Sequence, residues 1–187
     1  MAFHTDPFYA ECRAYGRINE MQIKRKLNQE IVIKCHGFLI LKERDKKLLQ
    51  ERGVDLGITR LDRTLPGESG EVRAIVKDLA PPDSGVNPRN MNQILRDIRR
   101  LKKCRIYNRD IRAENFKRGK LVDFGSAVTE PHCILSAFDK IAEEEAKDTR
   151  SEDLVMFEDM IVEEEIETDV RALPNLEYCQ KLRSWVV

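Results

Sequence analysis

Three polar side chains near the middle of the chain have the types and spacing for chemistry on a charged ligand. Asp110 follows Arg109, and Asn115 lies five residues beyond Asp110. Asp123 begins the tripeptide Asp123-Phe124-Gly125 a little further on. A carboxylate can accept the proton of a substrate hydroxyl, and carboxylate and amide oxygens are ligands for Mg²⁺. Asp110, Asn115 and Asp123 therefore form the candidate functional site of this chain.

The elements that position these residues can be predicted from hydrophobic periodicity and turn residues. Asn87-Pro88 is typical of a helix start, and a 3.6-residue period follows it. This pattern predicts a helix over about residues 88–104, with an apolar face formed by Met91, Ile94, Leu95, Ile98 and Leu101. Phe116 and Leu121-Val122 flank a turn at Gly119, which predicts a two-stranded hairpin. The predicted order is helix, polar loop, hairpin and Asp-Phe-Gly.

The rest of the chain predicts a mixture of helices and strands. Asp6-Pro7 marks the start of a helix over residues 7–27, and residues 31–41 read as a strand that is bulged or broken at Gly37. The remaining predictions are a short helix or turn at 45–51, a loop to residue 70, a strand at 72–79, an irregular loop at 126–134, helices at 135–149 and 154–166, and a last short helix carrying Tyr178, Leu182 and Trp185.

Size and composition fit a single domain of residues 1–187, which we expect to divide into 1–80 and 81–187. The chain has no apolar run of about 18 residues or more, so no membrane span is expected. No signal peptide is visible at the N-terminus. Five scattered cysteines without Cys-x-x-Cys spacing indicate an intracellular, reducing compartment and argue against a zinc site.

Charge is distributed unevenly along the chain. Residues 1–125 contain 27 Lys and Arg against 17 Asp and Glu, whereas residues 126–187 contain 6 against 16. One interpretation is that the two segments face each other or water. The other is that the basic helix and loop at 89–112 bind nucleic acid or an acidic partner.

Three segments carry a resemblance to a known family. Pro7–Arg17 resembles the helix that follows the lysine strand in fungal kinase-like proteins, and Lys34–Phe38 resembles the next strand. Ile106–Asn115 is similar to the catalytic loop of protein kinases, with Asp-Phe-Gly following in the expected order. Over residues 7–135 the chain resembles a fungal kinase-like family of inner-kinetochore subunits. This resemblance implies protein partners and, for localisation, the nucleus and the kinetochore.

The resemblance also implies roles for individual residues. Asp110 matches the catalytic base, with Arg109 as its neighbour, and Asn115 and Asp123 match the metal ligands of phosphoryl transfer. Val76, Lys77, Asp78 and Leu79 fall where the hinge to the adenine would lie, and ATP and Mg²⁺ are the implied cofactors. The residues alone leave an alternative open, in which Asp110 and Asn115 brace their loop and Asp123 caps its turn.

The chain departs from the kinase pattern at three places. No Gly-rich loop or lysine strand precedes Glu11, Asn108 stands where the motif has His, and no Ala-Pro-Glu follows Gly125. Without a fixed cation and backbone donors for the phosphates, we expect catalysis to be weak.

The resulting interpretation is an α+β, protein-kinase-like two-lobe fold with a reduced N-lobe and a shortened helical C-lobe. The expected function is that of a pseudokinase-type interaction module, associated with the kinetochore or chromatin. The alternative is a protein kinase whose Gly-rich loop and lysine strand are missing from this sequence.

Overall fold

The computed structural model describes residues 6–27, 31–56, 72–136 and 140–173. It divides into two compact units, one formed by residues 35–78 and the other by residues 1–34 together with 79–187. The described part is a mixed α+β structure with five α-helices and three two-stranded sheets. The predicted helix at the N-terminus therefore belongs to the same unit as Asp110. The predicted boundary at residue 80 and the two-lobe arrangement stay predictions.

The unit of residues 35–78 is an antiparallel ribbon with one helix. Strand β1 (Cys35–Leu41) pairs with β2 (Val72–Lys77), and α3 (Glu43–Glu51) follows β1. The register shifts between Cys35 and Gly37, so the predicted bulge at Gly37 is confirmed. Strand β2 ends two residues before the predicted limit. The predicted loop that follows α3 lies largely outside the described residues. Within the described residues of this unit no apolar side chain is buried.

Helix α2 (Pro7–Ile23) begins where the sequence predicts, because the Asp6 carboxylate accepts a hydrogen bond from Phe8 N at 2.8 Å. The helix ends four residues earlier than predicted, at Ile23. Its buried face consists of Ala10, Ala14, Tyr15 and Ile18. The Tyr15 ring meets the edge of Phe124, with 5.2 Å between ring centroids, so α2 packs directly on the Asp-Phe-Gly segment.

Helix α4 (Met91–Lys103) carries the apolar face that the period predicts, and all five of its residues are buried. The helix begins three residues later than predicted. Asn87 caps a turn instead, because its side-chain oxygen accepts from Arg89 N at 3.0 Å and its carbonyl accepts from Asn90 N at 3.1 Å. The proline at position 88 therefore lies in this turn and not in the helix.

The predicted hairpin is confirmed as β4 (Phe116–Lys117) and β5 (Lys120–Leu121). Arg118 and Gly119 connect the strands with φ angles of 50° and 74°, as a tight two-residue hairpin turn requires. One pairing was not predicted. Strand β3 (Ile106–Tyr107) pairs with β6 (Val128–Thr129), so the predicted irregular loop at 126–134 is wrong at those two residues.

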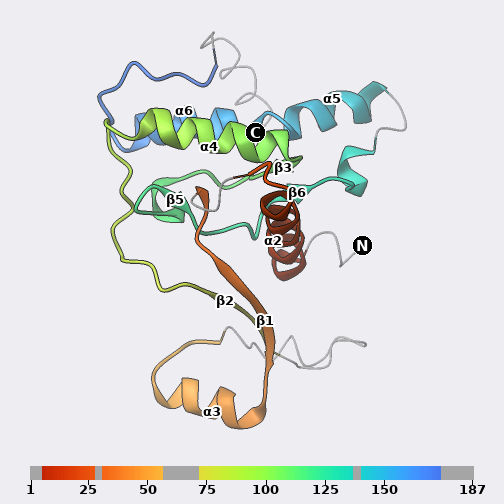
Figure 1. Ribbon diagram of the computed structural model, residues 1–187, viewed down its shortest axis with the longest axis vertical. Helices are drawn as coiled ribbons and strands as arrows, with labels where there is room; N and C mark the ends of the chain where they lie inside the picture. Colours follow the sequence, from red (N-terminus) through yellow and green to blue (C-terminus); the bar gives the residue numbers. More distant parts are fainter. Residues whose placement is uncertain (1–5, 28–30, 57–71, 137–139, 174–187) are drawn as a thin grey trace. The chain divides into compact units, whose positions relative to one another are not determined.

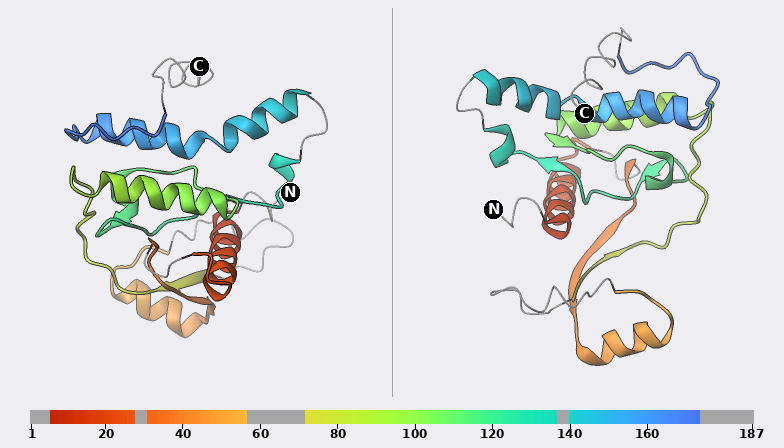
Figure 2. Two further views of the ribbon diagram at one scale, coloured as in Figure 1. Left: turned by 45° about the horizontal axis from the view of Figure 1, so that its top comes forward. Right: turned by 180° about the vertical axis from the view of Figure 1, so that it is seen from behind.

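Of the C-terminal described elements, α6 (Glu152–Glu163) packs against α4. A 3₁₀ turn, η4 (Cys133–Leu135), precedes α5 (Lys140–Thr149), and α6 follows. Figures 1 and 2 show α6 side by side with α4. Both helices were predicted, with starts displaced by a few residues. The predicted last helix lies outside the described residues. Among the helices of the described ranges, none has the length and apolar composition that crossing a membrane demands.

Candidate functional site

Asn108 joins the two segments of the candidate site. Its side-chain nitrogen Nδ2 donates to the backbone carbonyl of Asp123 at 2.7 Å, and its Oδ1 accepts from the backbone N–H of Asp110 at 2.9 Å. The residue follows β3 directly and is 2% exposed. A buried amide that uses both its donor and its acceptor fixes the separation of the groups that it bridges. In the sequence Asn108 stands out only because the kinase motif has His at this position, and no sequence pattern indicates that it bridges the two segments.

Asp110 is surrounded by hydrogen-bond donors from its own loop. Arg112 contacts both carboxylate oxygens, with Nε 2.8 Å from Oδ1 and Nη2 3.0 Å from Oδ2. Asn115 Nδ2 donates to the same Oδ2 at 2.8 Å and to the backbone carbonyl of Asp110 at 3.0 Å. Asp110 and Asn115 are thus brought together as predicted, but as partners of each other. A fork-shaped ion pair with arginine holds a carboxylate in a fixed orientation.

Asn115 lies before the hairpin and is bonded to the residue that follows it, whereas Asp123 caps the next turn. Asn115 lies in a 3₁₀ turn, η3 (Ala113–Asn115), and its carbonyl accepts from Val122 N at 3.0 Å. The Asp123 Oδ1 accepts from Gly125 N at 2.7 Å, which caps the turn of the Asp-Phe-Gly segment. Bracing and capping are the roles that the sequence left open as the alternative, and the structure contains both. The predicted binding of metal by Asn115 and Asp123 stays a prediction.

Arg109 connects the loop to helix α6. Its Nε lies 2.5 Å from Glu152 Oε2 and its Nη2 lies 3.3 Å from Oε1. The arginine therefore anchors the loop to the first turn of α6 through a two-pronged ion pair. Its predicted place beside a catalytic base stays a prediction.

The four residues predicted at the hinge lie at the end of β2 and in the connection that follows it. Val76 and Lys77 are the last two residues of the strand. Asp78 Oδ1 lies 2.6 Å from His36 Nε2, within hydrogen-bond distance. Leu79 is fully exposed and begins the other unit. Their predicted contact with an adenine stays a prediction.

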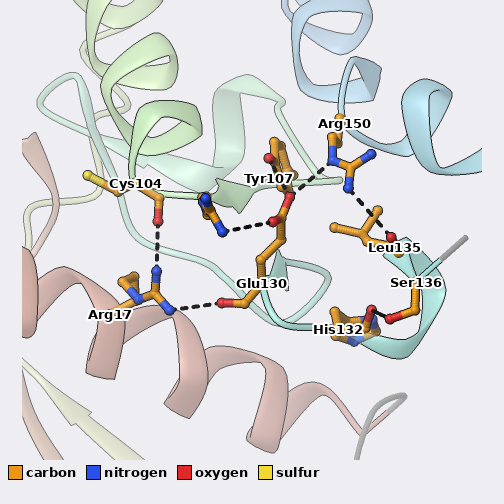
Figure 3. Close-up of polar contacts among 9 residues, drawn as sticks. Arg17, Cys104, Tyr107, Glu130, His132, Leu135, Ser136 and Arg150 are labelled. Atoms are coloured by element: carbon orange, nitrogen blue, oxygen red, sulfur yellow. Dashed lines mark hydrogen bonds and ion pairs between the residues drawn. The ribbon is translucent and has the colours of Figure 1, made fainter.

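A polar network around Glu130 was not predicted at all (Figure 3). Glu130 follows β6, and its Oε1 accepts from Tyr107 Oη at 2.8 Å and from Arg150 Nε at 3.0 Å. Burial acts to raise the pKa of Glu130, but the hydrogen bonds from Arg150 and Tyr107 outweigh it and lower the pKa overall. Burial and the bond to Glu130 both raise the pKa of Tyr107. The network joins the small β3–β6 sheet to the segment between α5 and α6.

Arg17 fixes helix α2 to the same sheet. Its Nη2 donates to the carbonyl of Glu130 at 2.8 Å and its Nη1 to the carbonyl of Cys104 at 3.4 Å (Figure 3). Its Nε pairs with Glu20 on α2 at 3.2 Å. One arginine thus links α2 to the segments before β3 and after β6, which lie at the same end of this strand pair.

Lys102 and Asp153 link α4 to α6. Lys102 Nζ lies 2.8 Å from Asp153 Oδ1, and Asp153 is 1% exposed. Burial raises the pKa of Asp153 to about 6, despite the opposing charge and hydrogen bond of Lys102. With Arg109–Glu152 this pair joins the basic segment to the acidic one, which agrees with the first interpretation of the charge pattern.

Other cations of α4 also have contacts within the chain. Arg100 pairs with Asp97 at 3.0 Å, Arg96 donates to Gln93 at 2.8 Å, and Arg99 donates to the carbonyl of Ala172 at 3.2 Å. The ion pairs of Arg100 and Lys102 neutralise part of the positive charge of this helix, whereas the hydrogen bonds of Arg96 and Arg99 leave their charges in place.

Comparison with known proteins identifies a family for most of the chain. The family model described as "Kinetochore Sim4 complex subunit FTA2" matches residues 1–128, which include α2, α4 and all three candidate residues. No curated protein and no solved structure matches the chain.

Proposed function

The chain belongs to the FTA2 family of Kinetochore Sim4 complex subunits, and we propose that it acts as a protein-binding subunit of a kinetochore complex. We further propose that its fold is related to that of protein kinases and that it transfers no phosphoryl group. The first proposal places the chain in the nucleus, at the kinetochore.

The bonding of Asp110 is the observation that carries the non-catalytic part of the proposal. A general base needs a lone pair directed at the substrate hydroxyl. Arg112 and Asn115 together use three of the roughly four lone-pair positions of the Asp110 carboxylate, so little of it is left for a substrate. One carboxylate oxygen of Asp123, Oδ1, already accepts a hydrogen bond from the N–H of Gly125. Asp110 and Asn115 thus brace their own loop and Asp123 caps its own turn, and neither role requires catalysis.

The order of elements supports a relation to protein kinases. Helix α4, the Asp110 loop, the β4–β5 hairpin and Asp-Phe-Gly follow one another as in the kinase catalytic region. Phe124 is fully buried and contacts Tyr15 of α2. This contact places an N-terminal helix against the Asp-Phe-Gly segment within one compact unit.

A nucleotide experiment tests the absence of phosphoryl transfer. Purified protein is incubated with ATP, Mg²⁺ or Mn²⁺ and a generic protein substrate, with Asp123→Asn and Arg112→Ala as companions. We expect no phosphorylation by any of the three proteins. Phosphorylation by the natural chain that disappears in Asp123→Asn would instead establish the alternative, an active kinase. A rise in melting temperature with ATP and metal would show binding without transfer.

A localisation experiment tests the kinetochore role separately. A fluorescent fusion of the chain is imaged together with a kinetochore marker in dividing cells. We expect coincident foci, and a diffuse signal from a fusion that rescues loss of the natural gene would refute this role. Asn108→Ala, which is expected to weaken the fold, serves as the variant that should lose the foci.

A further inference from the structure

We propose that the loop at residues 82–90 and the turn of the β4–β5 hairpin form a docking surface for an acidic segment of a partner protein. This basic turn surface carries four cationic side chains, Arg89, Lys117, Arg118 and Lys120. It lies at the beginning of α4, away from the paired cations along the rest of that helix. The inference rests on the proposed protein-binding role and names a surface and a partner chemistry for it.

Backbone contacts hold the loop and the turn against each other. Arg118 N donates to the carbonyl of Asp83 at 3.0 Å, and Gly119 N donates to the carbonyl of Ser84 at 2.7 Å. A Cβ on Gly85 would lie 2.7 Å from the backbone of Arg118, so the two chains touch directly. The cations consequently project from a preorganised backbone, which reduces the entropy lost on binding.

Side chains of the loop complete this rigid arrangement. Asn87 and Asn90 both donate from Nδ2 to the carbonyl of Gly85, and Asn90 Oδ1 accepts from Asn87 N at 3.1 Å. Lys117 Nζ donates to the carbonyl of Pro82 at 3.2 Å. Because this acceptor is neutral, the bond positions the ammonium group and leaves its positive charge in place. Helix α4 starts directly after Asn90, so the positive end of its dipole adds to the field of the cations.

Within the described residues, the charges of this surface are not balanced by ion pairs. Across the described ranges, the side chains of Arg89, Arg118 and Lys120 take part in no ion pair, whereas Arg100, Lys102, Arg105, Arg109 and Arg112 each do. Asp83 is the one acidic residue within segments 82–90 and 116–121, and its Oδ1 accepts from Gly85 N at 3.1 Å. An excess of positive charge is therefore presented to the solvent.

The surroundings favour a protein partner over DNA. Four cations neutralise few phosphates, and most of the α4 cations are already engaged. Pro82 and Pro88 are exposed on the same loop and provide apolar contact that a phosphate backbone does not use. An acidic, partly apolar peptide segment matches this combination.

Fluorescence anisotropy with two labelled probes tests the inference. The probes are a glutamate-rich peptide and a duplex DNA of mixed sequence, each titrated with the full chain at low salt. The variant is Arg89→Gln/Arg118→Gln/Lys120→Gln. The matched control is Arg25→Gln/Lys103→Gln/Lys147→Gln, which removes the same charge from three exposed side chains that also lack an ion pair within the described residues. The substituted side chains are exposed or half-buried, and equal melting temperatures of both variants show that each stays folded.

We expect the peptide to bind and its affinity to fall about tenfold in the first variant and less than about twofold in the control. Raising the salt concentration should weaken binding of the natural chain more than that of the first variant. Equal losses in the two variants, or no binding of the peptide, would overturn the proposal. Tighter binding of DNA through the same three residues would also overturn it, because the partner class would be wrong. The localisation result is independent of all these outcomes.

Discussion

The amide of Asn108 and the backbone carbonyl of Asp123 are 2.7 Å apart, and this hydrogen bond ties the Asp110 loop to the Asp-Phe-Gly segment. The same amide accepts from the N–H of Asp110 at 2.9 Å. Two loops that come from different elements thus share a single buried side chain. The first prediction follows from its removal.

Asn108→Ala should lower the free energy of unfolding by about 1–3 kcal/mol, because it leaves the half-buried N–H of Asp110 and the half-buried carbonyl of Asp123 without their partner. Urea denaturation monitored by circular dichroism measures the loss. Asn92→Ala makes the same change at an exposed position of α4 and should alter stability by less than about 0.5 kcal/mol. If the two substitutions cost the same, Asn108 does not bridge the loops in solution.

Gly85→Ala should destabilise the protein by about 2–4 kcal/mol. Gly85 has a φ of +68°, and an added Cβ would lie 2.7 Å from the backbone of Arg118, which cannot move aside cheaply. Gly16→Ala is the matched control, because no atom lies within 4 Å of its added Cβ and the residue is inside helix α2. The control should stabilise the protein by about 0.5–1 kcal/mol, so denaturant midpoints that shift in opposite directions are expected.

Asp153 should make the protein less stable as pH rises from about 4 to about 7. The folded-state pKa of about 6 exceeds the ordinary value of 3.8, so the folded state binds the proton more tightly. The stabilisation is complete below the ordinary pKa and is lost as pH rises through the folded pKa. The difference between the two values corresponds to on the order of 3 kcal/mol.

Asp153→Asn should remove this slope from a plot of unfolding free energy against pH. Asp148→Asn, at an exposed position of α5, should leave the slope in place. A slope that persists in Asp153→Asn would assign it to another group and would contradict the expected burial cost of this carboxylate.

Ionisation of Glu130 should make the protein more stable as pH rises, which is the opposite of the effect of Asp153, and it should do so at lower pH. Its folded-state pKa is lowered, so its stabilisation is present above the ordinary value of 4.5 and is lost as pH falls through the folded pKa. Glu130→Gln should therefore reduce stability at pH 7 by about 1–3 kcal/mol, since charged hydrogen bonds to Tyr107 and Arg150 are lost. The difference between the variant and the natural chain should shrink in acid. A constant difference across this range would argue against an ionised Glu130 in the network.

The sequence predicted the local elements well, because their signals are local. The apolar period of α4, the Asp6-Pro7 start of α2 and Gly119 in the hairpin turn each need only neighbouring residues to be interpreted. The pairing of β3 with β6 was missed, since strands of two residues are too short to show an alternating pattern.

The candidate site was predicted in part for the same reason. Asp110 and Asn115 are five residues apart in one loop, and the structure places them in direct contact. The roles of Asn108, Glu130 and Asp153 depend on partners 15 to 51 residues away, and no spacing rule in the sequence points to such contacts. Nothing in the sequence of the basic segment 89–112 indicates the ion pair between Arg112 and Asp110.

The pairing of Cys35 with Lys77 has a consequence for the evolution of this chain. Because those residues are cross-strand partners, the polypeptide leaves and re-enters the helical unit at neighbouring points. The unit of residues 35–78 is therefore an appendage whose length can change, or which can be exchanged, while the rest of the chain keeps its connectivity. Relatives of this chain are therefore expected to differ most in the size of this appendage, and a short turn grafted across its base would give a minimal scaffold that keeps Asn108 and its partners.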